Sequence, residues 1–159
     1  MNILIHPYAA RLHNGAPNPK NFPWWADVVA QLNELGYEVV QIGIKGEDRV
    51  EGVGQFIVGW PLQRLRHVVD DCATFISVDS FLPHFTHVEC GRKRGVVIWS
   101  QSDPLIWGHP ENINLLKDRN SLAANQFLWW EATEHNPDTF VKPEEILPHI
   151  NDVESMKTI

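Results

Sequence analysis

The chain has 159 residues, with 20 acidic and 13 basic side chains and a formal net charge of −7. This surplus of negative charge argues against sequence-independent binding to nucleic acid, which needs rows of Lys and Arg to neutralise phosphates. Hydrophobic residues make up 43% of the chain, yet no apolar run approaches the roughly 20 residues that a membrane span needs. Because the first residues begin a strand and no secretory signal is recognisable, we expect a cytoplasmic protein.

The first half of the chain alternates β-rich runs with amphipathic segments. A proline precedes or begins each amphipathic segment, which suits the first turn of a helix. The loop between residues 8 and 22 is rich in Gly, Asn and Pro, and a loop of this length is usually functional or disordered. The sequence predicts strands at 2–5, 37–42 and 55–58 and helices at 23–36 and 61–71.

The stretch from Ala73 to Gly108 is interpreted as a strand, a polar turn, a helix, a strand and a polar loop in succession. Its strands, at 75–78 and 96–99, are continuous apolar or β-branched runs typical of parallel strands buried on both faces. Asp79-Ser80 stands between strand and helix, where a side-chain oxygen would cap the helix. Beyond it, the pattern predicts a strand at 113–116 and helices at 127–133 and 144–153.

Strands that alternate with helices predict a parallel, doubly wound sheet with right-handed crossovers. The fold class is therefore α/β: a single Rossmann-like domain with about six mainly parallel strands, helices on both faces and a helical C-terminal extension. We place the domain at residues 1–118, the extension packed on it at 119–154 and a tail at 155–159.

In open α/β sheets, ligands bind in the crevice beyond the carboxyl ends of the strands. Asp79, Ser80, His84 and the loop from Ser100 to Asp103 are expected to face it. Lys20 stands just ahead of a predicted helix, where a cation and the helix N-terminus suit an anion. If the first and fourth strands are adjacent, the two loops converge on one crevice that would suit a diphosphate.

The order of these motifs resembles the C-terminal, donor-binding half of glycosyltransferase family 9, the heptosyltransferase-like enzymes of GT-B fold that use ADP-heptose. The resemblance covers about residues 2–116. It is carried by His6-Pro7, Lys20-Asn21-Phe22-Pro23, the strand that ends at Gly43, Gly59, Asp79-Ser80-Phe81-Leu82-Pro83-His84, and Ser100-Gln101-Ser102-Asp103-Pro104.

The resemblance implies a nucleotide or nucleotide-sugar ligand and no cofactor. It implies that Lys20 contacts the donor phosphates and that Asp79, Ser80 and His84 lie at the nucleotide-sugar site. The full set of predicted binding residues is His6, Lys20, Gly43, Asp79, Ser80, His84, Ser100, Ser102 and Asp103. The family carries its catalytic base on an N-terminal domain, so transfer would need a homodimer or a partner chain to supply the second half of the cleft.

The sequence departs from the family pattern, and two other functions stay open. Phe81 and Ser100 replace glycines, and Phe22 replaces a tryptophan. Phe81, with the Trp24-Trp25 and Trp129-Trp130 pairs, favours a non-catalytic interaction protein that keeps the fold. A small nucleotide hydrolase or transferase would use Asp79 and His84 as its acid/base pair.

Simpler structural roles are the alternatives for the same residues. Asp79-Ser80 could serve only as a helix cap, and Lys20 could be a solvated loop lysine. His84 and His87 share a helix face and could hold a metal with Asp79 or Glu89. No carboxylate or cysteine stands at a recognised ligand spacing, so the sequence predicts no metal.

Overall fold

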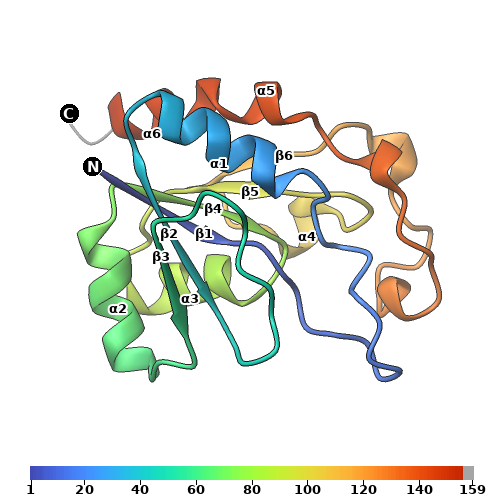
Figure 1. Cartoon of the computed structure of the whole chain (residues 1–159). Helices are drawn as coiled ribbons and strands as arrows, with labels where there is room; N and C mark the ends of the chain where they lie inside the picture. The colour runs from blue at the N-terminus through green and yellow to red at the C-terminus, as the bar shows by residue number, and fades with distance from the viewer. Residues whose placement is uncertain (156–159) are drawn as a thin grey trace.

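The protein folds around one parallel sheet of six strands in a computed structural model, which describes residues 1–155. The strand order is β3-β2-β1-β4-β5-β6, and every neighbouring pair is parallel (Figure 1). The strands are β1 Asn2–His6, β2 Glu38–Gly43, β3 Gln55–Val58, β4 Thr74–Val78, β5 Val96–Ile98 and β6 Ile113–Leu115. The predicted Rossmann-like α/β fold is confirmed.

Helices cover both faces of the sheet. In Figure 1, α1, α5 and α6 lie on one side of the strands, and α2 and α3 lie on the other. The helices are α1 Trp25–Glu34, α2 Leu62–Asp71, α3 Phe81–Glu89, α4 Pro104–Trp107, α5 Pro143–Ile146 and α6 Pro148–Ser155. Three 3-10 turns, η1 Arg119–Ser121, η2 Trp129–Glu131 and η3 Pro137–Thr139, lie between β6 and α5.

Alternate side chains of each central strand supply two separate cores. Ile3 and Ile5 of β1 pack with α1 and α6 in one cluster, whereas Leu4 packs with α3 in the other. All three side chains are fully buried. Burial on both faces explains why these strands are continuous apolar runs rather than alternating ones.

The chain reverses direction across the sheet between β1 and β4. These two strands are neighbours in register, with Ile5 opposite Ile76 and His6 opposite Ser77. The first three strands extend to one side of this point and the last three to the other. A crevice beyond the carboxyl ends of the two strands is the usual ligand site of such sheets. The first and fourth strands are adjacent, which is the condition under which the two predicted loops would converge on one crevice.

The region after β6 contains less helix than the sequence predicts. Residues 127–133 form only the turn η2, because Leu128 adopts a left-handed conformation with φ 54°. The expected helix at 144–153 is two helices, since Pro148 begins α6 directly after Leu147 and has no N–H to continue α5. The loop after Ser102 instead contains the single-turn helix α4, which the sequence analysis missed.

The C-terminal helices complete the core on the α1 side of the sheet. Ile146 of α5 and Ile150 and Val153 of α6 are buried in the cluster that contains Ile3 and Ile5. Of the predicted tail, only Ser155 is described, as the end of α6, and the remainder lies outside the described residues. The boundary at residue 118 stays a prediction. Within residues 1–155, no helix combines the length and hydrophobicity needed to cross a bilayer.

Candidate functional site

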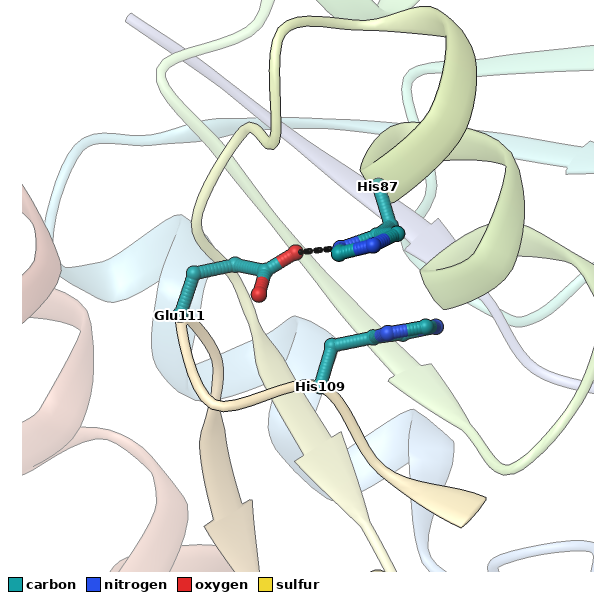
Figure 2. A group of neighbouring side chains, drawn as sticks. All are labelled: His87, His109 and Glu111. Atoms are coloured by element: carbon teal, nitrogen blue, oxygen red, sulfur yellow. Dashed lines mark hydrogen bonds and ion pairs between the residues drawn. The ribbon is translucent and has the colours of Figure 1, made fainter.

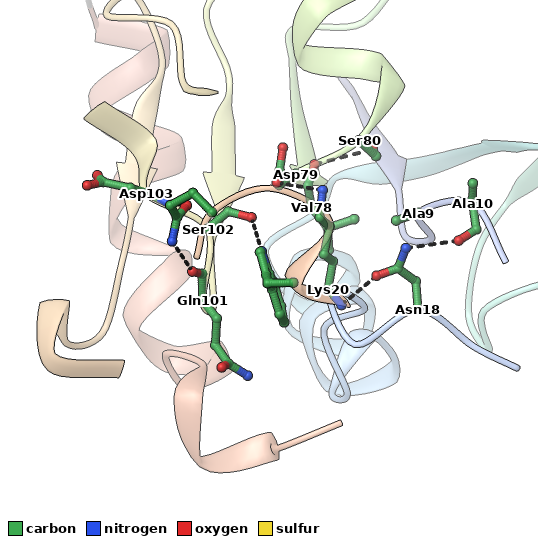
Figure 3. Close-up of polar contacts among 12 residues, drawn as sticks. Ala9, Ala10, Asn18, Lys20, Val78, Asp79, Ser80, Gln101, Ser102 and Asp103 are labelled. Carbon is green, nitrogen blue, oxygen red and sulfur yellow. Dashed lines mark hydrogen bonds and ion pairs between the residues drawn. The ribbon is translucent and has the colours of Figure 1, made fainter. Parts of the chain in front are cut away.

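Lys20 and Asp79 form an ion pair at the carboxyl edge of β1 and β4. The Lys20 Nζ lies 2.9 Å from the Asp79 Oδ2, and the two side chains are only 14% and 10% exposed (Figure 3). Asp79 directly follows β4, whereas Lys20 comes from the long loop after β1. The two predicted loops therefore meet, and Lys20 is not a solvated loop lysine.

Asn18 orders the loop that presents Lys20. Its buried side chain donates to the carbonyl of Ala10 at 2.9 Å and accepts from the Lys20 backbone N–H at 3.0 Å. Asn favours such local bonds to nearby backbone because its side chain mimics a turn. The predicted alternative of a disordered loop is thus excluded for this segment.

Ser80 occupies the N-cap position of α3, but its side chain does not cap the helix. The Oγ is hydrogen-bonded to the His6 Nδ1 at 2.9 Å instead, and the Asp79 carboxylate is paired with Lys20. The expected capping role of Asp79-Ser80 is therefore wrong. The first backbone N–H groups of α3 receive no side-chain acceptor from this N-cap, and they lie at the positive end of the helix dipole.

His6 ends β1 and stays neutral at physiological pH. It is 8% exposed, and burial lowers its pKa from 6.5 to about 4. The ring lies edge-on to Phe81, 6.2 Å between centroids. It therefore contributes a hydrogen-bonding group rather than a charge.

Two cavities meet at the Lys20–Asp79 pair. The larger, of about 340 Å³, extends from the pair past His6, Tyr8 and Glu47, and Phe81 forms part of its wall. The smaller, of about 110 Å³, extends towards His84, Ser102 and Trp107. The two share Lys20, Asp79 and Trp130. Among the described residues that line them, Lys20 is the only Lys or Arg.

Phe81 does not plug the larger cavity. Its ring stacks on Phe85 with 5.0 Å between centroids, and 41% of the residue is exposed. On its other side Phe81 lines a third hollow of about 230 Å³ together with Gly43 and Gly59. Phe81 therefore forms part of the wall of the crevice without filling it.

Some of the other predicted binding residues line the cavities and others do not. A Cβ at Gly43 would collide with the Glu47 carboxylate, so the glycine leaves room for that side chain. Ser102 lines the smaller cavity and accepts a 2.7 Å hydrogen bond from the Trp129 indole. Ser100 is buried, and its hydroxyl has no hydrogen-bond partner among residues 1–155.

Asp103 is committed to local structure. Its carboxylate caps α4 by accepting from the Leu105 N–H at 2.9 Å and pairs with Arg119 at 2.8 Å. The hydrogen bond from Arg119 lowers the pKa of this carboxyl group. Neither Asp103 nor Ser100 lines the two cavities, so the expectation that the whole loop from Ser100 to Asp103 faces the crevice is wrong.

His84 projects from α3 beside the smaller cavity and contacts a second histidine. Its Nδ1 lies 2.8 Å from the Nε2 of His109. Burial, followed by the nearby imidazoles of His87 and His84, lowers the pKa of His109. Asp79 pairs with Lys20 and His84 contacts His109, while both Asp79 and His84 line the smaller cavity; their use as an acid/base pair stays a prediction.

Sequence reasoning missed Trp130 and Glu47. Lys20 Nζ lies 3.8 Å above the centroid of the Trp130 ring, so the aromatic face and Asp79 together fix the ammonium group. Burial raises the pKa of Glu47, whose side chain lines the larger cavity. A signal for Trp130 existed, because an adjacent pair of tryptophans places one ring nearer the surface; Trp129 is buried and Trp130 is half-buried.

The fold and this geometry define a class of protein: a Rossmann-like α/β domain with a polar crevice at the point where its strand order reverses. The crevice combines one restrained cation and a helix N-terminus, which are suited to a phosphate, with two carboxylates, which can accept hydrogen bonds from hydroxyl groups. No family model matches the chain, and no curated protein matches it.

Solved structures of heptosyltransferases share the fold. The chain resembles E. coli ADP-heptose LPS heptosyltransferase II with a TM-score of 0.72 and 18% identity, over 99% of this chain and 47% of that one. It also resembles TibC from enterotoxigenic E. coli H10407, an iron-containing dodecameric glycosyltransferase, with a TM-score of 0.69 and 19% identity, over 97% and 46% of the two chains.

A second TibC structure, in complex with ADP-D-beta-D-heptose, matches with a TM-score of 0.68 and 19% identity, over 98% of this chain and 45% of that one. The protein therefore spans just under half the length of these enzymes. At such identities the likeness concerns the fold alone, and at that level the predicted resemblance to half of a heptosyltransferase is confirmed.

Proposed function

We propose that this protein binds a nucleoside diphosphate, or the corresponding nucleotide-sugar, in the crevice between the ends of β1 and β4. The observation that carries the proposal is the Lys20–Asp79 pair, 2.9 Å apart, beside a helix N-terminus without a side-chain cap. The cation and the free N–H groups are both suited to a diphosphate. ADP-D-beta-D-heptose in one structural neighbour is a ligand of this type.

The diphosphate and the Asp79 carboxylate would both contact the Lys20 ammonium group. Pro83 lacks an N–H and Leu82 is fully buried, so the donor that the first turn of α3 would offer to the larger cavity is the backbone N–H of Phe81. Lys20 is held in position by Asp79 and Trp130 before any ligand arrives, which lowers the entropy cost of binding. Ser80 adds a hydroxyl to the same wall of the larger cavity.

Glu47 supports recognition of the nucleoside part. It follows β2, the strand after which Rossmann-like domains carry the carboxylate that binds ribose hydroxyls. Its side chain lines the same cavity as Lys20. We therefore assign the diphosphate to the Lys20 side of this cavity and the ribose to the Glu47 side.

Glycosyl transfer is the reaction proposed for the complete cleft of a GT-B enzyme. An acceptor hydroxyl would attack the anomeric carbon as the nucleoside diphosphate leaves with the bonding electrons, and a general base would take the hydroxyl proton. Lys20 and the α3 N-terminus suit the leaving group. The second half of the cleft, with the base, would come from a homodimer or a partner chain, and a cytoplasmic location remains part of this proposal.

Calorimetric titration tests binding with ADP, UDP, GDP, their sugars and inorganic pyrophosphate. Lys20→Met should weaken binding of the preferred nucleotide by about 10- to 100-fold, the range of a charge-assisted hydrogen bond. Lys142→Met is the matched control, because Lys142 also lies over a tryptophan, Trp24, at 4.0 Å but away from the crevice.

Glu47→Gln separates the two parts of the ligand. It should weaken the nucleoside diphosphate while leaving inorganic pyrophosphate within about twofold, since only the former has a ribose. No binding of any nucleotide at millimolar concentration would refute the proposal. Equal losses in the Lys20 and Lys142 variants would refute the assignment of the phosphate site.

A non-catalytic interaction protein is the second candidate, and exposed apolar side chains on α4 favour it. Leu105 and Ile106 are 82% and 59% exposed, and Phe127, which lies between η1 and η2, is 70% exposed. Light scattering of wild type and a Leu105→Ser/Ile106→Ser double variant would test it. Concentration-dependent association that the double variant loses, without nucleotide binding, would favour this reading over the first.

A further inference from the structure

Three side chains outside the nucleotide crevice converge at the far end of α3. His87 comes from this helix, and His109 and Glu111 come from the loop between α4 and β6 (Figure 2). One potential ligand atom of each lies within 4.8 Å of those of the other two. Among residues 1–155, this is the only such group of three His, Cys, Asp or Glu side chains.

The side chains of the cluster lie close enough together to contact one cation. The His87 Nδ1 lies 2.5 Å from the Glu111 Oε1, and the rings of His87 and His109 stack with 4.0 Å between centroids and 13° between planes. His84 contacts His109 from the other side at 2.8 Å. Imidazole nitrogens and a carboxylate oxygen are ligand atoms that zinc accepts.

We propose that His87, His109 and Glu111 form a binding site for a divalent transition-metal ion such as zinc. Two imidazoles and one carboxylate match the three-ligand set of open zinc sites, in which water or a substrate takes the fourth position. The sequence analysis predicted no metal and paired His84 and His87 with Asp79 or Glu89. The structure instead places Glu111 beside His87.

Small side-chain adjustments would close the site around an ion. Ligand atoms that are each about 2.1 Å from one tetrahedral zinc lie about 3.4 Å apart. The His87 and Glu111 atoms, 2.5 Å apart, would therefore separate by about 0.9 Å, and atoms as far apart as 4.8 Å would approach by about 1.4 Å. The stacked rings must also rotate until their lone pairs converge. His87 and Glu111 retain 26% and 18% side-chain exposure, which leaves them free to turn and gives an ion a path of entry.

The metal site adjoins the nucleotide crevice through His84, which lines the smaller cavity and contacts His109. It does not depend on nucleotide binding, because none of its three ligands lines either cavity. The iron named for TibC is a property of that protein. Here the proposal is carried by the two histidines and the glutamate.

Equilibrium competition with a chromophoric chelator tests the site on the full chain stripped of metal, with Zn²⁺ as the probe. We expect uptake of one equivalent. His87→Gln, His109→Gln and Glu111→Gln should each lower zinc affinity by at least about tenfold, since even the partners of ligating groups typically cost that much. Absorption of the Co²⁺-loaded wild type should show the strong visible bands of low coordination rather than the weak ones of hydrated Co²⁺.

His149→Gln is the matched control. His149 is half-buried on α6 and lies 3.4 Å from the carboxylate of Asp152. The variant therefore removes an imidazole that lies beside a carboxylate, but at a different place in the protein. Its zinc affinity should equal that of wild type. Affinities that are the same in the wild type and the three ligand variants, or a Co²⁺ spectrum of the hydrated ion, would overturn the proposal. The Co²⁺ measurement uses wild-type protein and does not depend on how the variants fold.

Discussion

Two lysines of this protein lie over tryptophan rings at nearly the same distance, yet their surroundings differ. Lys20 is 3.8 Å from the centroid of Trp130, and Lys142 is 4.0 Å from that of Trp24. Lys20 is mostly buried and paired with Asp79 at the end of β4, whereas Lys142 is exposed at the start of α5. The ring contact alone therefore does not mark a site.

The difference lies in how much water each charge has lost. An exposed cation keeps its hydration, so a neighbouring ring or carboxylate changes its energy little. A cation withdrawn from water depends on its partners, and it interacts more strongly with an arriving anion because the surrounding medium screens less. The predictions below measure this dependence, beginning with the largest expected effect.

Replacement of Lys20 by Met should lower the free energy of unfolding by about 3 kcal/mol, because it leaves the Asp79 carboxylate buried without its cation. Lys142→Met should change it by less than about 0.5 kcal/mol, as is usual for exposed positions. Urea denaturation of both variants at pH 7 would measure the difference. Addition of Asp79→Leu to Lys20→Met should restore most of the loss; if it does not, the ion pair is not its source.

A fall in pH should destabilise the protein through His6. Its pKa is about 4 in the folded state and about 6.5 when unfolded, so between these values the unfolded chain binds more protons and stability declines as pH falls. The contribution of His6 to the free energy of unfolding should drop by about 2 kcal/mol from pH 7 to pH 5. Urea denaturation at both values should show this drop in wild type and its loss in His6→Gln.

The half-buried His149 supplies the comparison for that experiment. It lies beside Asp152 on α6, and His149→Gln should retain the steep pH dependence of the wild type. Equal flattening in both variants would contradict the assignment to His6.

The two cation–ring contacts should differ in coupling energy. Double-mutant cycles with Lys→Met and Trp→Leu should give about 1 kcal/mol for Lys20 with Trp130 and no more than about 0.5 kcal/mol for Lys142 with Trp24. A larger coupling for the exposed pair would show that burial does not distinguish the two. Cycles are the suitable measurement because they cancel the packing lost with each ring.

Much of the fold followed from patterns local to each element. All six strands were predicted because each is a β-rich run bounded by turn residues or helix starts. The parallel, doubly wound sheet was predicted because these strands alternate with helices. The C-terminal region was less predictable, because its outcome depended on single backbone positions. The left-handed Leu128 limits η2 to one turn, and Pro148 separates α5 from α6.

The site was predictable only where a residue stands next to a predicted strand end or helix start. Asp79 was found because it follows a buried strand, and Lys20 because it precedes a helix. Trp130 and Glu111 approach their partners from remote segments, and no spacing in the sequence indicates those contacts. Ser80 was misassigned as a cap because the sequence does not reveal that His6 would bond its hydroxyl.

The position of α6 has a consequence for synthesis on the ribosome. Ile150 and Val153 cover the same core that contains Ile3 and Ile5 of β1, so β1 is enclosed by a helix that is translated after all the strands of this sheet. A nascent chain that has emerged as far as β6 would still expose this apolar surface. We therefore expect the α1 side of the sheet to complete its folding only after α6 has been translated, with chaperone binding favoured until α6 docks.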